Sequence, residues 1–281
     1  MKHNWTVTGQ KIKLSDEVCK HLEIDAQLYA RLLDKREIRV NTIKATSNVA
    51  LQAGDVVSVF LPLKLTDKPL MQLDVVYSDD NLLVLDKPQG IDVMNFEKLV
   101  QAQYEGTQLV HRLDRNTRGI LVFGANSASA DILLRAFKTR TVKKVYVARV
   151  HGKWQVDRTY KAWLHKDSKL SLCRVYDTQR PGSKEIETHF RTIRVDDNTT
   201  WLQVKPHTGR THQIRAHLCH LNHPIIAEGK YSLPQFKQAN QLYIKSGIKY
   251  QQLFATELYF ESLPQPLQYL NKKVFSIAID K

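Results

Sequence analysis

One carboxylate of this chain stands among arginines where a polar loop leads into an apolar run. Asp114 lies between Arg112, Arg115 and Arg118, and residues 119–123 continue as an apolar strand. Nearby positive charge favours the ionised carboxylate, which can then act as a nucleophile or a base. The charge pattern alone favours the alternative, an aspartate that caps a turn or pairs with an arginine for stability, because ion pairs outnumber catalytic carboxylates.

A second segment dense in polar groups runs from Lys205 to Leu218. A Thr-Gly turn precedes a series of hydrogen-bond donors, interleaved with Ile214 and Leu218 at a spacing that suits one helix face. These groups can bind an anion or a polar base edge. Ile214 and Leu218 are expected to form apolar pocket walls or simply to belong to the core.

Three histidines follow at intervals of three residues, at positions 217, 220 and 223. Asn222 and Pro224 are expected to end the helix there, and no cysteine pair or carboxylate completes a common zinc ligand set. We therefore expect no metal. No phosphate-binding glycine loop and no dinucleotide-binding glycine motif after a strand is present, so no cofactor is expected.

The elements that must position these groups have mixed periodicity. Strand patterns occur at 82–85, 119–123, 144–150 and 201–204, and a helical pattern at 127–138, without a regular alternation of strands and helices. This favours an α+β fold with an irregular, largely antiparallel sheet, spanning residues 73–281. A segment with two prolines and several charges predicts a linker at 63–72.

Residues 1–62 predict a small separate module. Helical spacing covers 15–20 and 25–34, with Asp25 as the expected N-cap, and strands are expected at 36–41 and 56–60. A cluster of cations lies on the second helix and the hairpin after it: Arg31, Lys35, Arg36, Arg39 and Lys44. Such a cluster can neutralise phosphates, although a solvated helix face explains it equally well.

The overall charge points to a polyanion as partner. The 281 residues carry 42 Lys and Arg against 28 Asp and Glu, a formal net charge of +14. A field of that sign attracts nucleic acid or an anionic membrane surface. Residues 135–158 add a basic strip in which Tyr146 and Trp154 could stack on bases.

Targeting and cysteine patterns predict a cytoplasmic protein. No apolar run approaches the roughly 20 residues that span a bilayer, and no secretory signal is recognisable at the N-terminus. The three cysteines, at positions 19, 173 and 219, are odd in number and form no paired motif, so neither a disulfide framework nor a cysteine-based zinc site is expected.

Several motifs together resemble the RluA-type family of pseudouridine synthases. "HRLDRNTRGILVFGA" is similar to the catalytic motif, "FKTRTVKKVYVARVHG" to the Lys-x-Tyr strand, and "TGRTHQIRAHL" to the later arginine motif. "YSDDNLLVLDKPQGIDV" resembles the strand that opens the catalytic domain. "RLLDKREIRVN" followed by "LQAGDVVSV" resembles the αL RNA-binding domain found in a ribosomal protein and in many RNA-modifying enzymes.

The resemblance implies conversion of uridine to pseudouridine in RNA, without a cofactor. It assigns the essential carboxylate to Asp114, its paired arginine to Arg215 and the stacking partner of the flipped uracil to Tyr146. Arg112 is implied to fill the space that the target base leaves. Further motif residues are implied to bind substrate: His111, Lys144, Arg210, Thr211, His212, Gln213 and Ile214.

Within the family, the chain is most similar to the enzymes that modify several uridines of bacterial large-subunit ribosomal RNA, and a monomer is expected. It departs from the pattern at Arg118, where serine is usual, and at Ala227-Glu228, where Gly-Asp is usual. Two alternatives stay open: a non-catalytic RNA-binding or ribosome-assembly factor on the same fold, and the same activity on transfer RNA.

Overall fold

The computed structural model describes residues 2–9, 11–61 and 71–279. The chain divides into two compact units, Met1–Met71 and Gln72–Lys281. Residues 63–70 of the predicted linker lie outside the described residues. Among the helices that the structure does describe, none has both the length and the apolarity needed to cross a bilayer.

The N-terminal unit packs two short helices against a small sheet of order β1-β6-β3-β4. A buried cluster that includes Val18, Leu32 and Ile38 holds helices and sheet together. Its elements are β1 (Lys2–Thr6), β2 (Ile12–Lys13), α1 (Leu14–Leu22), α2 (Ala26–Asp34), β3 (Ile38–Val40), β4 (Ile43–Lys44), β5 (Ala50–Leu51) and β6 (Val56–Phe60).

Two local expectations for this unit can be compared with the structure. The Asp25 side chain accepts a hydrogen bond from the backbone N–H of Leu28 at 2.7 Å, which confirms it as the N-cap of α2. The strand expected at 36–41 is shorter, Ile38–Val40, because Arg36 adopts a left-handed conformation (φ 56°) just after the helix.

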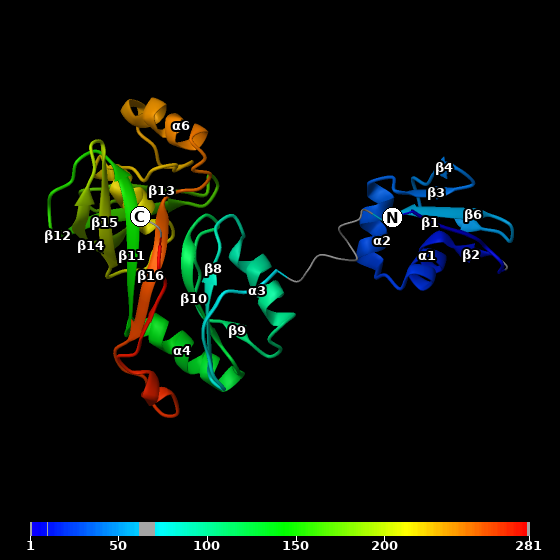
Figure 1. Cartoon of the computed structure of the whole chain (residues 1–281), viewed down its shortest axis with the longest axis horizontal. Coiled ribbons are helices and arrows are strands. Elements are labelled where there is room, and N and C mark those ends of the chain that lie inside the picture. The colour runs from blue at the N-terminus through cyan, green and yellow to red at the C-terminus, as the bar shows by residue number, and fades with distance from the viewer. Residues whose placement is uncertain (1, 10, 62–70, 280–281) are drawn as a thin grey trace. The chain divides into compact units, whose positions relative to one another are not determined.

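The larger unit is built on a long twisted sheet of order β13-β12-β14-β15-β11-β16-β10-β8-β7 (Figure 1). Adjacent strands run antiparallel except β10 and β16, which pair in parallel between Arg118–Phe254 and Gly119–Ala255. The expected α+β class with a largely antiparallel sheet is confirmed.

The strands of this unit are β7 (Val75–Ser78), β8 (Leu82–Lys87), β9 (Gln108–Leu109), β10 (Arg118–Gly124), β11 (Val142–His151), β12 (Arg158–Asp167), β13 (Leu172–Tyr176), β14 (Lys184–Val195), β15 (Thr199–Pro206), β16 (Leu253–Phe260) and β17 (Val274–Ser276). The helices are α3 (Val93–Gln101), α4 (Ser127–Thr139), α5 (Gln213–His220) and α6 (Lys237–Lys245), with short 3₁₀ turns at Pro234–Phe236 and Leu267–Leu270.

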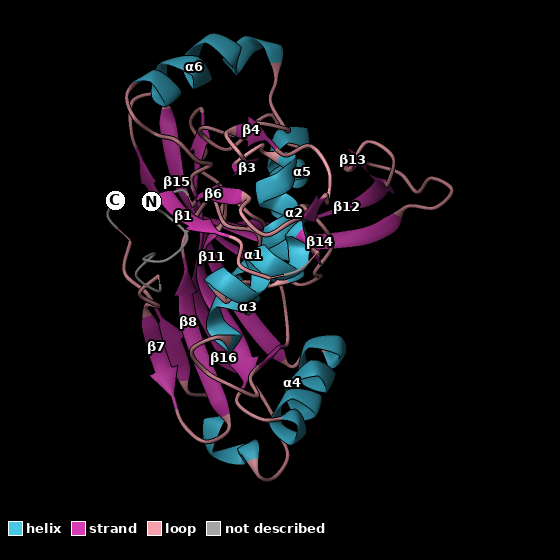
Figure 2. Cartoon of the chain, turned by 90° about the vertical axis from the view of Figure 1, so that its right-hand side faces the viewer, coloured by secondary structure: helices cyan, strands magenta, loops and turns pink. Residues whose placement is uncertain are grey.

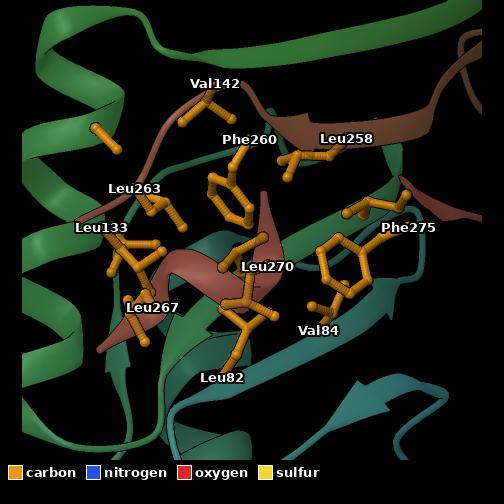
Figure 3. Close-up of a cluster of buried hydrophobic side chains, with 14 of the residues drawn as sticks. Leu82, Val84, Leu133, Val142, Leu258, Phe260, Leu263, Leu267, Leu270 and Phe275 are labelled. Carbon is orange, nitrogen blue, oxygen red and sulfur yellow. The ribbon is translucent and has the colours of Figure 1, made fainter. Parts of the chain in front are cut away.

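Helices cover the sheet at separate places, with α4 and α6 at opposite ends of the unit in both views (Figures 1 and 2). Under α4, Leu133 packs with Leu82 and Phe260 in a buried cluster (Figure 3). Leu270 and Phe275 belong to the same cluster. This core joins β8 and β10 to β16. Because β16 also pairs with β11, the loop before β10 is fixed relative to the middle of the sheet.

Candidate active site

Asp114 stands in the loop between β9 and β10, at the first position of a tight turn. The backbone N–H of Thr117 donates to the Asp114 carbonyl at 3.0 Å, and β10 begins at the next residue. The side chain of Gln251 donates to the hydroxyl of Thr117 at 3.0 Å. The turn is therefore anchored on both sides, and the carboxylate projects from a fixed backbone.

Lys87 fastens this loop to the end of β8. Its side chain is fully buried, and Nζ donates to three backbone carbonyls: Pro88 at 2.7 Å, Ile91 at 3.1 Å and Arg115 at 3.2 Å. Burial lowers the pKa of Lys87 to about 8, although the negative charge of Asp114 works in the opposite direction. Lys87 thus fixes the backbone of Arg115, the residue that follows Asp114.

Arg215 holds the carboxylate from the opposite side. From α5, its Nη1 donates to Asp114 Oδ2 at 2.8 Å, while Nε and Nη2 donate to the two oxygens of Glu228 at 2.7 Å each. Arg215 and Glu228 are buried, at 7% and 2% exposure. Burial alone would lower the pKa of Arg215, but the bonds and charges of Glu228 and then Asp114 outweigh it and raise that pKa.

A pocket of about 150 Å³ opens beside this carboxylate. Tyr146 lies at a bulge of β11 and is 8% exposed; burial, with a smaller contribution from Asp114, raises the pKa of its phenol, so the ring stays neutral. The pocket is lined by Arg112, Leu113, Asp114, Thr117, Lys144, Tyr146, Pro206, Thr208, Gly209, Arg210, Thr211, His212, Gln213, Ile214, Arg215 and Leu253.

His212 faces the carboxylate oxygen that Arg215 does not use. Its Nε2 lies 3.9 Å from Asp114 Oδ1, and its Nδ1 is 2.8 Å from the hydroxyl of Tyr231. That hydroxyl accepts from the backbone N–H of Cys173 at 2.9 Å. The phenol hydroxyl can donate its proton to Nδ1, and in that arrangement the imidazole proton is on Nε2, toward Asp114.

Gln213 shapes the wall of the pocket. Its Oε1 accepts from the Thr208 hydroxyl at 2.8 Å and from the backbone N–H of Arg210 at 3.0 Å. Its Nε2 donates to the Glu187 carbonyl and the Thr188 hydroxyl. The amide has no hydrogen-bonding capacity left for a ligand, so Gln213 fixes the loop before α5.

Of the catalytic and substrate-binding residues that the resemblance implies in this unit, His111 alone does not line the pocket, and Leu218 is a core residue. Its Nε2 accepts from the backbone N–H of Val122 at 3.1 Å, and its ring stacks on Phe137 at 4.4 Å. Burial lowers the pKa of His111 to about 3. The histidine thereby ties the loop before Asp114 to β10.

Other sequence features lie apart from the pocket. Arg118 pairs with the buried Asp86, with Nη2 at 2.9 Å from Oδ2, so its extra charge is neutralised within the sheet. Trp154 is 5% exposed and packs in an aromatic cluster, which rules out the expected base stacking by this ring. In the described part of the chain no cluster of metal-binding side chains occurs.

In the N-terminal unit the expected cations lie at the surface, apart from Arg39, whose guanidinium packs 5.1 Å from the centre of the Phe60 ring. Arg39 is paired across the hairpin with Lys44. Arg31, Lys35 and Arg36 are exposed around the end of α2.

Sequence reasoning missed the residues that support Asp114 from behind. Glu228 appears in the sequence only as a departure from a usual aspartate. Lys87 lies within the motif that opens the catalytic domain, but no role follows from it there, and Tyr231 lies in none of the motifs. A buried partner for Arg215 could have been expected from its position on an apolar helix face, since buried charges are paired. Its identity depends on which loop packs there.

Residues 81–220 match the family model described as RNA pseudouridylate synthase. The ribosomal large subunit pseudouridine synthase C of Vibrio cholerae is 34% identical over 231 residues, covering 73% of this chain and 72% of that protein. The protein of the same name from Haemophilus influenzae is 33% identical over 243 residues, covering 78% and 75%.

Two solved structures share the fold. Human RNA Pseudouridylate Synthase Domain Containing 1 superposes with a TM-score of 0.62 at 22% identity, covering 77% of this chain and 86% of that one. Human RNA Pseudouridylate Synthase Domain Containing 4 gives a TM-score of 0.57 at 20% identity, covering 74% and 89%.

Proposed function

The chain belongs to the RNA pseudouridylate synthase family, and from this premise we propose that it isomerises uridines of large-subunit ribosomal RNA through Asp114. The bond between uracil N1 and ribose C1′ breaks, the base turns, and uracil C5 bonds to the same carbon. C5 then loses its proton and N1 gains one, so that the product is an isomer of uridine. The observation that carries the proposal is the Asp114–Arg215 ion pair at 2.8 Å, held beside the Tyr146 ring in one pocket.

We assign roles to the residues of the pocket as follows. Asp114 acts on the ribose of the target nucleotide, and Arg215 orients its carboxylate through the 2.8 Å hydrogen bond from Nη1. Tyr146 offers its ring to the flipped uracil, and Ile214 adds an apolar wall. Arg112 is exposed at the mouth of the pocket, where it can enter the space left in the base stack. A closed pocket keeps the detached uracil from escaping.

The ribosomal substrate is proposed from the named relatives and from the N-terminal unit. We propose that residues 1–62 form an αL-type RNA-binding domain, joined by the linker at 63–72 to the catalytic domain at 73–281. Arg39 and Lys44 stand opposite each other across β3 and β4, where like charges repel unless a polyanion binds. The pocket is complete within one chain, and we propose that the enzyme acts as a monomer.

Site mapping of pseudouridine tests this proposal. Ribosomal and transfer RNA from cells that lack the enzyme are incubated with the wild-type protein or with Asp114→Asn. We expect new pseudouridines in large-subunit RNA with the wild type only, while both proteins bind RNA equally well. Sites confined to transfer RNA would refute the ribosomal target, and binding without any product would support a non-catalytic RNA-binding factor.

A further inference from the structure

A second cavity, of about 360 Å³, adjoins the pocket of Asp114. It lies among the end of α4, the start of β11, the loop after β15 and Tyr259 of β16, at the α4 end of the unit (Figure 1). The two cavities share five lining residues: Lys144, Pro206, Thr208, Gly209 and Arg210. A chain molecule with one residue in the first cavity can therefore continue into the second.

The lining of the second cavity carries charge of one sign. The described residues that line it include no Asp or Glu. They include six cations: Lys138, Arg140, Lys143, Lys144, Lys205 and Arg210. Only Lys143 has an ion-pair partner among the described residues, Glu261 at 3.2 Å. Such a one-sided field concentrates anions in the cavity.

Two of these cations stand at the junction without a counter-ion. Lys144 is partly buried, and its ammonium has no hydrogen bond or ion pair to any residue that the structure describes. Burial lowers the pKa of Lys144, the direction expected for an unpaired cation removed from water. The Nε of Arg210 is buried without a hydrogen-bond partner.

Arg215, which lines the same pocket, provides the contrast. Its Nε and Nη2 bond to Glu228 and its Nη1 bonds to Asp114. Folded proteins pair buried cations because an unpaired one costs free energy. Lys144 and the Nε of Arg210 lack such a partner at the wall that the two cavities share, where an external anion can supply it.

We propose that Lys144 and Arg210 bind the phosphodiester on one side of the target uridine, and that the cavity beyond them takes the nucleotides that follow. This inference rests on the proposed function, because it takes RNA as the ligand. Phe137 and Tyr259 add aromatic surface to the cavity, against which a base can stack. The target nucleotide is then bound at two points: its base lies in the first pocket, and its phosphodiester contacts Lys144 and Arg210.

Salt dependence of RNA binding tests the phosphate contacts without knowledge of the target. A 15-nucleotide oligouridylate is titrated with wild type, Lys144→Met and Arg210→Gln at several salt concentrations. Each lost phosphate contact should lower the slope of log K against log salt by about 0.7. Lys245→Gln, an exposed lysine of α6 at the far end of the unit, is the matched control and should leave the slope unchanged. An equal decrease of the salt slope in all three variants would refute a defined anion site.

Stability provides a second readout, which a merely structural role of Lys144 would not satisfy. Methionine keeps the length and apolar stem of lysine but removes the unpaired charge, so the free Lys144→Met protein should melt at the same temperature or higher. A lower melting temperature would show that the protein itself needs the cation, and would overturn the proposal.

The two proposals can fail separately. The wild type could form no pseudouridine in any RNA while the salt slope of RNA binding decreases in the two variants and not in the control. In that case the enzymatic proposal fails and the anion site stands. If pseudouridine forms and both variants bind oligouridylate with wild-type slope, the anion site is refuted while the enzymatic function stands.

Discussion

Arg215 contacts Asp114 through Nη1 alone, at 2.8 Å, because Glu228 occupies both Nε and Nη2 of the same guanidinium. The positive charge is thereby shared between two carboxylates. One oxygen of Asp114 is oriented by the arginine, while the other, Oδ1, is left facing the pocket and His212. Glu228 thus determines how strongly Arg215 neutralises the carboxylate that acts on the substrate.

The first prediction concerns this shared charge. Glu228→Gln leaves Arg215 with Asp114 as its only anionic partner, so the guanidinium charge is no longer shared between two carboxylates. We expect a single-turnover rate about tenfold lower, a change of ~1.4 kcal/mol in the activation free energy, with unchanged RNA affinity. Unfolding in urea should show a loss of about 2 kcal/mol, since a charged partner of a buried cation is gone.

The control for Glu228 is Glu185→Gln, which removes a carboxylate from an exposed ion pair with Lys161. Exposed pairs contribute little, so neither rate nor stability should change appreciably. A Glu228→Gln protein with the wild-type rate would show that sharing of the Arg215 charge has no part in catalysis.

A second prediction concerns the tautomer of His212. Tyr231→Phe keeps the ring that packs 5.2 Å from the Arg215 guanidinium but removes the proton donated to Nδ1. Long-range ¹H–¹⁵N spectra should show a proton on Nε2 in the wild type and a mixture of tautomers in the variant. We expect the single-turnover rate to fall about tenfold at saturating RNA, the worth of one neutral hydrogen bond.

The matched control is Tyr77→Phe, which removes a hydroxyl bonded to Asp79 at 2.6 Å outside the pocket. Its rate should equal that of the wild type. A wild-type His212 protonated on Nδ1 would contradict the arrangement, whatever the rate of the Tyr231 variant.

The sequence predicted those parts of the site whose residues are local to one motif. Asp114, Arg215 and Tyr146 were placed together from three segments by resemblance, and the pocket contains all three. Periodicity located β10, β11 and α4 to within about two residues, because their buried faces are continuous. The hydrophobic periodicity of each of these elements is therefore visible in its own sequence.

The remainder depends on contacts between distant segments, which one sequence does not display. The hairpins between Arg158 and Val195 were not predicted as strands, because alternating charges on their exposed faces hide the buried ones. Glu228 and Lys87 act through burial against loops that are far away in sequence. His111 lies within the catalytic motif, yet its partner is the Val122 backbone, a geometry that spacing cannot reveal.

The pH dependence of stability gives a third prediction. The pKa of His111 falls from 6.5 to about 3 on folding, so between these values the unfolded chain binds a proton that the folded one does not. The contribution of the neutral His111 to the free energy of unfolding is fully present above pH 6.5. It decreases as the pH falls toward 3, by about 3 kcal/mol between pH 7 and pH 4. Urea unfolding of wild type and His111→Gln at both pH values should show this loss in the wild type only. Parallel losses in the two proteins would contradict a His111 that is neutral in the folded state.

A fourth prediction tests the parallel pairing that connects the Asp114 loop to the rest of the sheet. Gly119 has φ +134°, and a Cβ there would lie 2.2 Å from the carbonyl oxygen of Ala255 on β16. The clash is with backbone, so Gly119→Ala must separate β10 from β16. We expect destabilisation of more than about 4 kcal/mol and loss of activity, measured by thermal melting and pseudouridine formation. Gly9→Ala, at a position with open space and no positive φ, should change stability by less than about 0.5 kcal/mol. If Gly119→Ala melts at the wild-type temperature, the close approach of β10 to β16 is not what holds Asp114 in place.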